Sequence, residues 1–284
     1  MEVIIRPDAE EAFNIASQII SDAIWERPQI CLGLATGRTM ESVYDKLVEL
    51  HTVFDLDFSL VRTFNLDEYI GLPPDNEGSY RYYMNKHLFN RINVDLRNTH
   101  LPNGMVGDLD WECERYERQI KEFGGIDLQL LGIGRSGHIG FNEPLSALQS
   151  RTRAKALTPV TIAQNAPLFT VPSDMPKRAI TMGVGTILEA KRILMVVTGE
   201  EKADILAQAV EGPVTSMVSA TALQLHPKCT VIVDESAATR LKGRDYYHWI
   251  FDNEPEWKRY RKRKHDKKEV SASYRTEKNQ SSSL

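Results

Sequence analysis

The amino-acid sequence predicts an α/β fold: an open, mostly parallel sheet with helices on both faces. Short apolar runs alternate with helical stretches, and strands that are apolar on both faces belong to parallel sheets covered on both sides. The length of 284 residues fits one large domain with a sizeable core. The composition, 42% hydrophobic and 26% charged, is that of an ordinary globular protein.

The first half of the chain contains three predicted strands, at 3–6, 30–35 and 60–66. Asp8 is a suitable N-cap for the first helix, and two glutamates follow in its first turn, where the helix dipole favours them. Apolar residues of the second helix recur on one face. The predicted helices of this half are 8–24, 39–50, 79–89 and 109–123.

The second half continues the alternation. The runs IDLQLLGI and RILMVVTG are apolar enough to be strands buried on both faces. A helix is expected at 200–210, directly after the second of these runs. The predicted strands of this half are 126–133, 153–157, 178–182, 192–199 and 229–234.

Several classes of protein are excluded by composition. No run of 18 apolar residues is present, which argues against a membrane span, and the N-terminus turns acidic too soon for a signal peptide. Cys31, Cys113 and Cys229 lie far apart, so we expect neither a disulfide scaffold nor a CxxC metal site. Their free thiols predict a reducing compartment, and hence a cytoplasmic protein.

Charge is distributed unevenly along the chain. The net charge is −4, yet residues 258–268 carry eight Lys or Arg against one Asp. The body is therefore acidic, which makes nucleic acid an unlikely partner for it. We predict a domain over 1–255 and a basic, disordered tail over 256–284. The tail is either a solvated terminus or a weak hook for an anionic surface or a localisation signal.

Ligands of open parallel sheets bind at the carboxyl ends of the strands, so the residues after each strand are the candidates for a site. Strand 30–35 is followed by Thr36, Gly37, Arg38 and Thr39, then by a helix. Free N–H groups at a helix N-terminus, two hydroxyls and an arginine would bind an anion. An ordinary strand-to-helix turn with a threonine cap is the alternative.

Two acids follow the strand at 60–66. Asp67 and Glu68 stand at the end of an otherwise apolar run. One of them could be a general base held near neutral pH by burial. Helix capping, or a surface turn, is the alternative.

The strand at 126–133 runs into a glycine-rich loop that carries His138. The loop spells GxGxxG, but no acidic residue follows about 20 positions later, so a dinucleotide site is poorly supported. Glu143 lies close enough in sequence to orient His138 as a proton carrier. Lys202, after the strand at 192–199, would suit a bound anion, although a solvated lysine is the commoner situation.

Several longer motifs resemble one family. The motifs are LATGRT, FNLDEYIGLP, LGIGRSGHIGFNEP, SRTRAKALT, GVGTILEAK and LQLHPK, and they occur in the same order in the glucosamine-6-phosphate deaminases of the glucosamine/galactosamine-6-phosphate isomerase family. The resemblance runs from about residue 3 to residue 250. The related 6-phosphogluconolactonases share the fold but carry a different acid motif after the third strand.

The resemblance implies a modified Rossmann-like fold and conversion of glucosamine 6-phosphate to fructose 6-phosphate and ammonia, with no metal and no cofactor. It implies that Asp67 moves a proton between C2 and C1. His138 would assist opening of the sugar ring, with Glu143 orienting it. The turn Thr36–Thr39 and Lys202 would hold the substrate phosphate.

Two positions depart from the family pattern. Ser136 stands where the family commonly has Asp or Asn, so one charge beside His138 is missing and altered pH dependence is expected. Pro167 occupies the position of an arginine that reaches the phosphate. We hypothesise that Arg38, where a glycine is common, replaces that lost charge from the opposite wall.

Regulation and assembly are also implied by the resemblance. Ser146, Arg153 and Lys155 match positions that bind the activator N-acetylglucosamine 6-phosphate in allosteric members, although strand-face charges would look the same. A homo-oligomer is expected. The alternatives are an enzyme for a related sugar phosphate such as galactosamine 6-phosphate, an isomerase without deamination, a lactonase, or a sugar-phosphate sensor of weak catalytic power.

Overall fold

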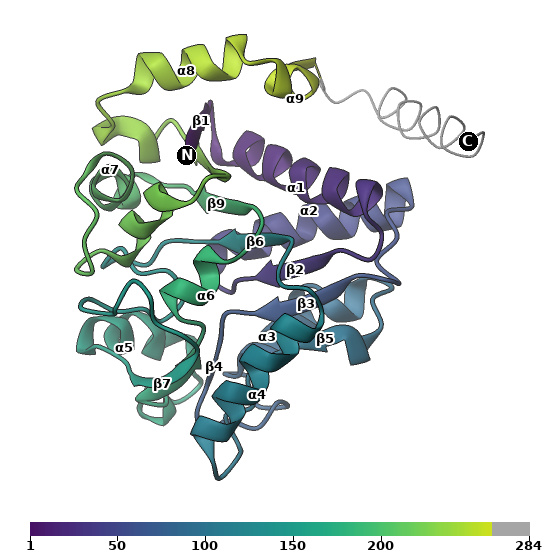
Figure 1. Ribbon diagram of the computed structural model, residues 1–284, viewed down its shortest axis with the longest axis vertical. Helices are drawn as coiled ribbons and strands as arrows, with labels where there is room; N and C mark the ends of the chain where they lie inside the picture. Colours follow the sequence, from purple (N-terminus) through teal and green to yellow (C-terminus); the bar gives the residue numbers. More distant parts are fainter. Residues whose placement is uncertain (263–284) are drawn as a thin grey trace. The chain divides into compact units, whose positions relative to one another are not determined.

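The computed structural model describes residues 1–262, and the chain divides into two compact units, Met1–Lys242 and Gly243–Leu284 (Figure 1). The first unit contains every element predicted up to residue 234. Of the predicted tail, residues 263–284 lie outside the described residues. The domain boundary at 255 therefore stays a prediction.

The first unit is built on a seven-stranded sheet in which every neighbouring pair is parallel. The strand order is β1-β10-β9-β6-β2-β3-β5. The predicted α/β class with a mostly parallel, Rossmann-like sheet is confirmed. In the order of the sheet, the strands are β1 (Glu2–Arg6), β10 (Cys229–Asp234), β9 (Ile193–Val197), β6 (Leu128–Leu131), β2 (Cys31–Leu34), β3 (Arg62–Asn65) and β5 (Thr99–His100).

Helices connect these strands, and their ends follow from local chemistry. The Asp8 carboxylate accepts the backbone N–H of Glu11 at 2.8 Å, which begins the first helix as predicted. The second helix outruns its predicted end at residue 50 until Asp55, in the left-handed conformation at φ 58°, ends it. The helices of this unit are α1 (Ala9–Glu26), α2 (Arg38–Phe54), α3 (Tyr80–His87), α4 (Leu109–Glu122), α5 (Pro159–Asn165), α6 (Val184–Leu188) and α7 (Ala203–Glu211).

The helices pack on the sheet through apolar side chains. In Figure 1, α1 and α2 lie side by side, and α1 also packs against β1, β9 and β10. Tyr116 of α4 packs edge-on against Phe64 of β3, and its hydroxyl donates to the Asn65 carbonyl at 2.7 Å. The two contacts of Tyr116 anchor the carboxyl end of β3, shortly before Asp67.

A second, three-stranded antiparallel sheet was not foreseen from the sequence. It consists of β4 (Asp67–Tyr69), β8 (Arg178–Thr181) and β7 (Arg153–Ala156), in that order. The strands predicted at 153–157 and 178–182 exist, but they pair with each other and with β4 outside the main sheet. Asp67 is thus the first residue of a strand, and it faces Thr181 across the pair.

An aromatic cluster fills the space beside this small sheet. Tyr69 and Phe141 are buried there with Leu157 and Met175, and Phe169 packs edge-on against the ring of Tyr69. The second unit contains α8 (Arg244–Asn253) and α9 (Lys258–Lys262), with the Trp257 ring 5.6 Å from that of Tyr260. Within the described part of the chain, every helix is too short or too polar to cross a membrane.

Candidate functional site

The predicted site residues follow four strands that are neighbours in the main sheet, β9, β6, β2 and β3. Lys202 comes after β9, the loop with His138 after β6, Thr36–Thr39 after β2, and Asp67 after β3. Parallel strands end at one edge of the sheet, so these segments meet on one side of the molecule.

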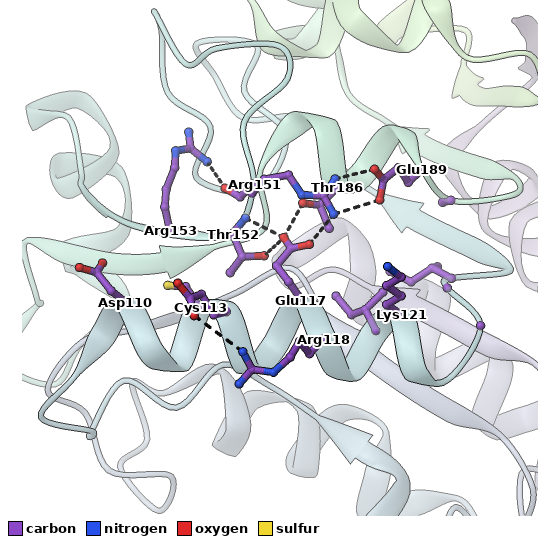
Figure 2. Close-up of a pocket in the computed structure, with 16 residues that line it drawn as sticks. Asp110, Cys113, Glu117, Arg118, Lys121, Arg151, Thr152, Arg153, Thr186 and Glu189 are labelled. Atoms are coloured by element: carbon purple, nitrogen blue, oxygen red, sulfur yellow. Dashed lines mark hydrogen bonds and ion pairs between the residues drawn. The ribbon is translucent and has the colours of Figure 1, made fainter.

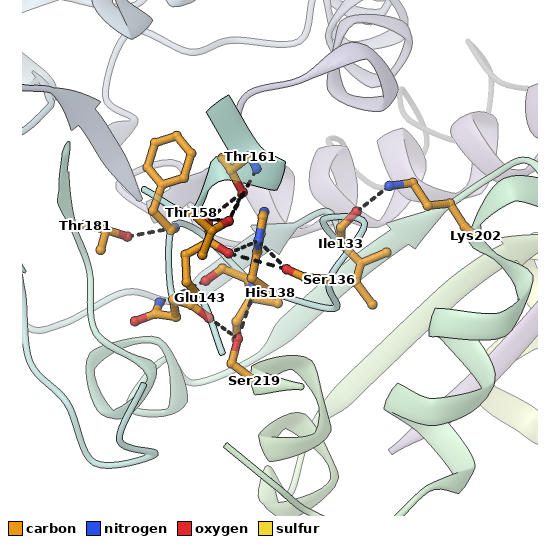
Figure 3. Close-up of polar contacts among 12 residues, drawn as sticks. Ile133, Ser136, His138, Glu143, Thr158, Thr161, Thr181, Lys202 and Ser219 are labelled. Atoms are coloured by element: carbon orange, nitrogen blue, oxygen red, sulfur yellow. Dashed lines mark hydrogen bonds and ion pairs between the residues drawn. The ribbon is translucent and has the colours of Figure 1, made fainter. Parts of the chain in front are cut away.

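His138 is held by a carboxylate and a hydroxyl from its own loop (Figure 3). Its Nδ1 lies 3.0 Å from Oε2 of Glu143 and 2.9 Å from Oγ of Ser136. An ionised carboxylate only accepts hydrogen bonds. Nδ1 therefore carries a hydrogen and donates a hydrogen bond to Glu143. Both contacts are made by Nδ1, so the opposite nitrogen, Nε2, is the one that could exchange a proton with a substrate.

Glycines shape this loop around the imidazole. A Cβ on Gly134 would lie 2.0 Å from Nε2 of His138, so the ring packs directly on the Gly134 main chain. Gly137 takes φ +77°, which only glycine adopts without strain. The central glycine of the GxGxxG spelling, Gly134, is therefore explained by the packing of His138, and the last, Gly137, by its positive φ and by its close approach to Val218 and Ile205.

Glu143 is buried and fully engaged. Its Oε1 accepts hydrogen bonds from the hydroxyls of Thr158, at 3.2 Å, and Thr161. Burial by itself would raise the pKa of Glu143, but the hydrogen bond and positive charge of His138, with the Thr161 hydroxyl, outweigh it and lower the pKa to about 2. The carboxylate is therefore ionised throughout the physiological range.

Asp67 has the opposite electrostatic character. It is buried, and burial together with the negative charge of Glu68 raises its pKa to about 8, although the Phe141 N–H partly offsets this. Gly140 adopts φ +54° next to it, and a Cβ there would lie 3.3 Å from Oδ2 of Asp67. The His138 loop thus passes directly over the Asp67 carboxyl.

Glu68 is the structural member of the acidic pair. Its carboxylate accepts three backbone N–H groups, those of Tyr69, Tyr80 and Arg81, at 2.8 to 2.9 Å. Two of these groups are at the start of α3, so Glu68 caps that helix. Alternation along β4 therefore separates the two acids: Glu68 caps a helix, and Asp67 takes no part in that cap.

The predicted anion turn is held from α3. The Tyr83 hydroxyl donates to the Gly37 carbonyl at 2.8 Å, and Thr36 shares a hydrogen bond with Tyr80. Gly37 is the N-cap of α2 and provides no side-chain cap, so first-turn N–H groups of a 17-residue helix remain available to a ligand. Arg38 is exposed, as the first residue of that helix.

Lys202 reaches the loop after β6. It ends a short 3₁₀ turn just before α7, rather than standing inside the helix, and its Nζ donates to the Ile133 carbonyl at 2.9 Å (Figure 3). Burial lowers its pKa, and the positive charge of Arg135 acts in the same direction. Pro167 lies exposed in the 3₁₀ turn Ala166–Leu168.

The three residues of the possible activator set are separately placed. The Ser146 hydroxyl is buried and has no hydrogen-bond partner among residues 1–262, and Arg153 donates to Oδ1 of Asn142 at 2.9 Å. Lys155 is exposed on β7, two residues from Arg153.

A cleft of about 980 Å³ lies between α4 and the segments 151–153 and 186–190, and Arg153 is among its lining residues (Figure 2). Glu117 is the hub of its hydrogen bonds, accepting from Thr152, Thr186 and Arg151. None of Asp67, His138 and Glu143 lines this cleft, so it is separate from the predicted catalytic residues.

Three contributors escaped the sequence analysis: Gly140, Thr158 and Thr161. The role of Gly140 depends on its positive φ, which a sequence does not reveal. Threonines at the start of a helix look like ordinary caps. Among residues 1–262, no three His, Cys, Asp or Glu side chains gather in a way that could hold a metal ion.

Comparisons with known proteins agree with this geometry. Residues 8–232 match the family described as glucosamine-6-phosphate isomerases/6-phosphogluconolactonase. The glucosamine-6-phosphate deaminases of Shewanella woodyi and Hahella chejuensis are 46% and 48% identical over 250 residues, which are 88% of this chain and 95% of each relative.

Solved structures point the same way. A monomeric glucosamine-6-phosphate deaminase superimposes with a TM-score of 0.83 at 43% identity, over 84% of this chain and all of the other. The 6-phosphogluconolactonase of Trypanosoma cruzi, at 19% identity and a TM-score of 0.66, shares the fold over 85% of this chain and 97% of its own. The chain therefore belongs to the glucosamine-6-phosphate isomerase/6-phosphogluconolactonase family.

Proposed function

We propose that the protein is a deaminating isomerase that converts glucosamine 6-phosphate and water to fructose 6-phosphate and ammonia. Two separate acid–base groups carry the proposal. One is the buried Asp67 carboxyl, and the other is the imidazole of His138, which Glu143 holds in place on the loop that passes over Asp67. The relatives named as glucosamine-6-phosphate deaminases, 44–48% identical along most of the chain, support the same choice.

Ring opening is the first step. Nε2 of His138 takes the proton of the C1 hydroxyl, the bond from C1 to the ring oxygen breaks, and the imidazolium returns that proton to the ring oxygen, which leaves an aldehyde at C1. Glu143 stabilises the imidazolium that forms, because its carboxylate accepts from Nδ1 at 3.0 Å.

Proton transfer between carbons follows. The Asp67 carboxylate removes the proton from C2 and returns it to C1, while a proton of the substrate ammonium passes to the C1 oxygen, so C1 is reduced to an alcohol as C2 is oxidised to an iminium. Water adds to C2, and ammonia leaves to give the ketose. A buried carboxyl is suited to this transfer because its raised pKa makes it a stronger base than an exposed aspartate. The ammonium of the substrate would favour the ionised form of Asp67 on binding.

The phosphate would lie away from the reacting carbons, at the N-terminus of α2 and Lys202. Its binding energy holds C1 and C2 against Asp67 and His138. Arg38 is exposed at this N-terminus. It is proposed to supply the positive charge toward the phosphate that Pro167, which stands at the position of an arginine in the family, cannot supply. The absence of an effect of Arg38→Gly on KM for a phosphorylated sugar would exclude that role.

Ammonia release from glucosamine 6-phosphate by the purified chain, without added metal, tests the proposal. Galactosamine 6-phosphate is assayed in parallel, and Asp67→Asn is the control, which should bind the substrate but release no ammonia. Release from the galactosamine ester alone would instead assign the related substrate. Binding without release from either ester would favour a sensor.

Regulation, assembly and location are further parts of the proposal. N-acetylglucosamine 6-phosphate would act at Ser146, Arg153 and Lys155, and the link from Arg153 to Asn142, next to Glu143, supports a route to the catalytic loop. A homo-oligomer rests on the family resemblance, against one relative described as monomeric, and light scattering decides it. Three free, buried cysteines support a cytoplasmic location.

A further inference from the structure

Among residues 1–262, Glu143 is the single charged hydrogen-bond partner of His138. Ser136 brings only a hydroxyl to Nδ1, at 2.9 Å, and the same hydroxyl lies 3.4 Å from Oε2 of Glu143. The orientation of the imidazole therefore depends on one carboxylate. If that carboxylate rotated away, Nδ1 would keep only a neutral partner that does not fix which ring nitrogen carries the proton.

The other oxygen of that carboxylate is fixed by α5. Oε1 of Glu143 accepts from the Thr161 hydroxyl and, at 3.2 Å, from that of Thr158 (Figure 3). Thr161 is 3% exposed, so water cannot easily replace its hydroxyl. Thr158 lies 3.2 Å from the Thr161 hydroxyl and caps α5 by accepting the Thr161 N–H, so it also orients its neighbour.

We propose that Thr161 is a positioning residue for the proposed reaction: it holds the Glu143 carboxylate so that one acid alone orients His138. The kinetic test of this inference rests on the proposed function. The inference adds a residue that compensates for the lack of a charged side chain at position 136, where Ser136 brings only a hydroxyl to His138. Thr161 touches Glu143 and not the reacting atoms, and its effect passes through His138.

The kinetic test uses the full chain and Thr161→Val, which keeps the shape and removes the hydroxyl. We expect kcat for ammonia release from glucosamine 6-phosphate to fall at least tenfold with KM changed less than threefold, because binding of the phosphate is untouched. Thr161→Ser should restore kcat to within threefold. Loss of kcat in both variants, or in neither, would contradict the proposal.

A matched control separates this role from the general cost of removing a buried hydroxyl. Thr186 is 2% exposed, and its hydroxyl donates to the Glu117 carboxylate at 2.6 Å in the cleft of Figure 2. Thr186→Val should lower the free energy of unfolding about as much as Thr161→Val while leaving kcat unchanged. Equal losses of kcat in the two variants would reduce Thr161 to a stability residue.

Coupling to Ser136 gives the sharper test. In a Ser136→Asp background a second carboxylate faces Nδ1, so Thr161→Val should then cost less than threefold in kcat. An undiminished tenfold loss in that background would overturn the proposal.

A readout without turnover distinguishes this inference from the proposed function. Nitrogen chemical shifts of the His138 ring report which nitrogen carries the proton, and Thr161→Val should change them where Thr186→Val does not. If the protein releases no ammonia but this change is seen, the proposed function fails and the positioning role of Thr161 stands. Unchanged shifts would overturn the role itself.

Discussion

Asp67 and Glu68 have different surroundings because successive side chains of strand β4 point to opposite sides. Glu68 accepts hydrogen bonds from three backbone N–H groups, whereas Asp67 lies against the main chain of Gly140. The hydrogen-bonded acid stabilises the fold, and the other keeps a proton near neutral pH because burial raises its pKa to about 8. The raised pKa of Asp67 is thus obtained at the expense of stability.

That expense predicts a pH-dependent effect of Asp67→Asn on stability. The pKa is about 8 in the folded chain against 3.8 in the unfolded chain, so wild-type stability declines as pH rises between these values. The asparagine variant has no such titration. The difference in free energy of unfolding, variant minus wild type, should increase by roughly 1 kcal/mol per pH unit from pH 5 to 8 and then stay constant.

Urea unfolding of both proteins at pH 5, 6, 7 and 8 measures the difference. A constant gap between the two proteins over this range would mean that Asp67 ionises at its ordinary pKa. The same variant should release no ammonia at any of these pH values.

We predict that the small size of Gly140 lets the His138 loop lie close to the Asp67 carboxyl. Its φ is +54°, and a Cβ would lie 2.9 Å from Oγ1 of Thr181 and 3.3 Å from Oδ2 of Asp67. Gly140→Ala should therefore cost about 1–2 kcal/mol of stability and lower kcat roughly tenfold or more, because the loop must move off the carboxyl. Steady-state ammonia release and thermal unfolding measure the two effects.

Gly71→Ala is the matched control. Gly71 has a φ of +89°, but a Cβ there would meet nothing within 4 Å. It should show a comparable loss of stability with an unchanged kcat. If both variants lose activity alike, backbone strain rather than crowding at Asp67 is responsible.

At the scale of elements, the sequence predicted the strands of the main sheet well, except β5, and it did not predict the small sheet. Runs such as ILMVV are long and apolar, and burial on both faces leaves a clear pattern. The strand β4 is the three residues Asp67–Tyr69, too short for any periodicity, and two of them are charged. Its strand form comes from pairing with β8, a contact between residues more than 100 positions apart.

The site was predictable to the extent that it follows the ends of strands. His138, Glu143 and Asp67 could be proposed because residues after parallel strands share one edge, and because the motifs resemble a family; their catalytic roles stay predictions. Thr161 was not found because its partner Glu143 lies 18 residues away and the two meet only when α5 packs beside the loop. Hydrogen bonds between separate elements leave no local signature in a sequence.

The capping of α3 by Glu68 predicts two effects of Glu68→Gln. The amide retains one acceptor oxygen for three N–H groups, so stability should fall by about 1–3 kcal/mol. The like charge beside Asp67 also disappears, which lowers the pKa of Asp67. The rise of kcat/KM with pH should therefore begin at a lower pH than in the wild type.

Ser79→Ala provides the comparison, since the Ser79 hydroxyl caps the same helix by accepting the Tyr82 N–H at 3.0 Å. It should cost about 1 kcal/mol of stability and leave the pH profile of kcat/KM in place. A shifted profile in both variants would attribute the shift to movement of α3 and not to the charge of Glu68.

Over the whole molecule, the large sheet supplies the turn Thr36–Thr39, which is proposed to bind phosphate, and the His138 loop, while the small sheet supplies Asp67 and the strand before α5. All the proposed catalytic and phosphate residues precede residue 203, and the family match ends at residue 232. The second unit, Gly243–Leu284, thus begins after the last of them.

This division predicts that residues 258–284 can be deleted without loss of catalysis. The deletion removes the basic run 258–268, so the net charge becomes more negative than −4, but no described contact of Asp67, His138, Glu143 or Lys202 is removed with it. We expect kcat and KM within twofold of the full chain, and a midpoint of thermal unfolding within about 3 °C. A large fall in kcat with an unchanged midpoint would place the C-terminal segment in the active site, whereas a fall in both would make it part of the fold.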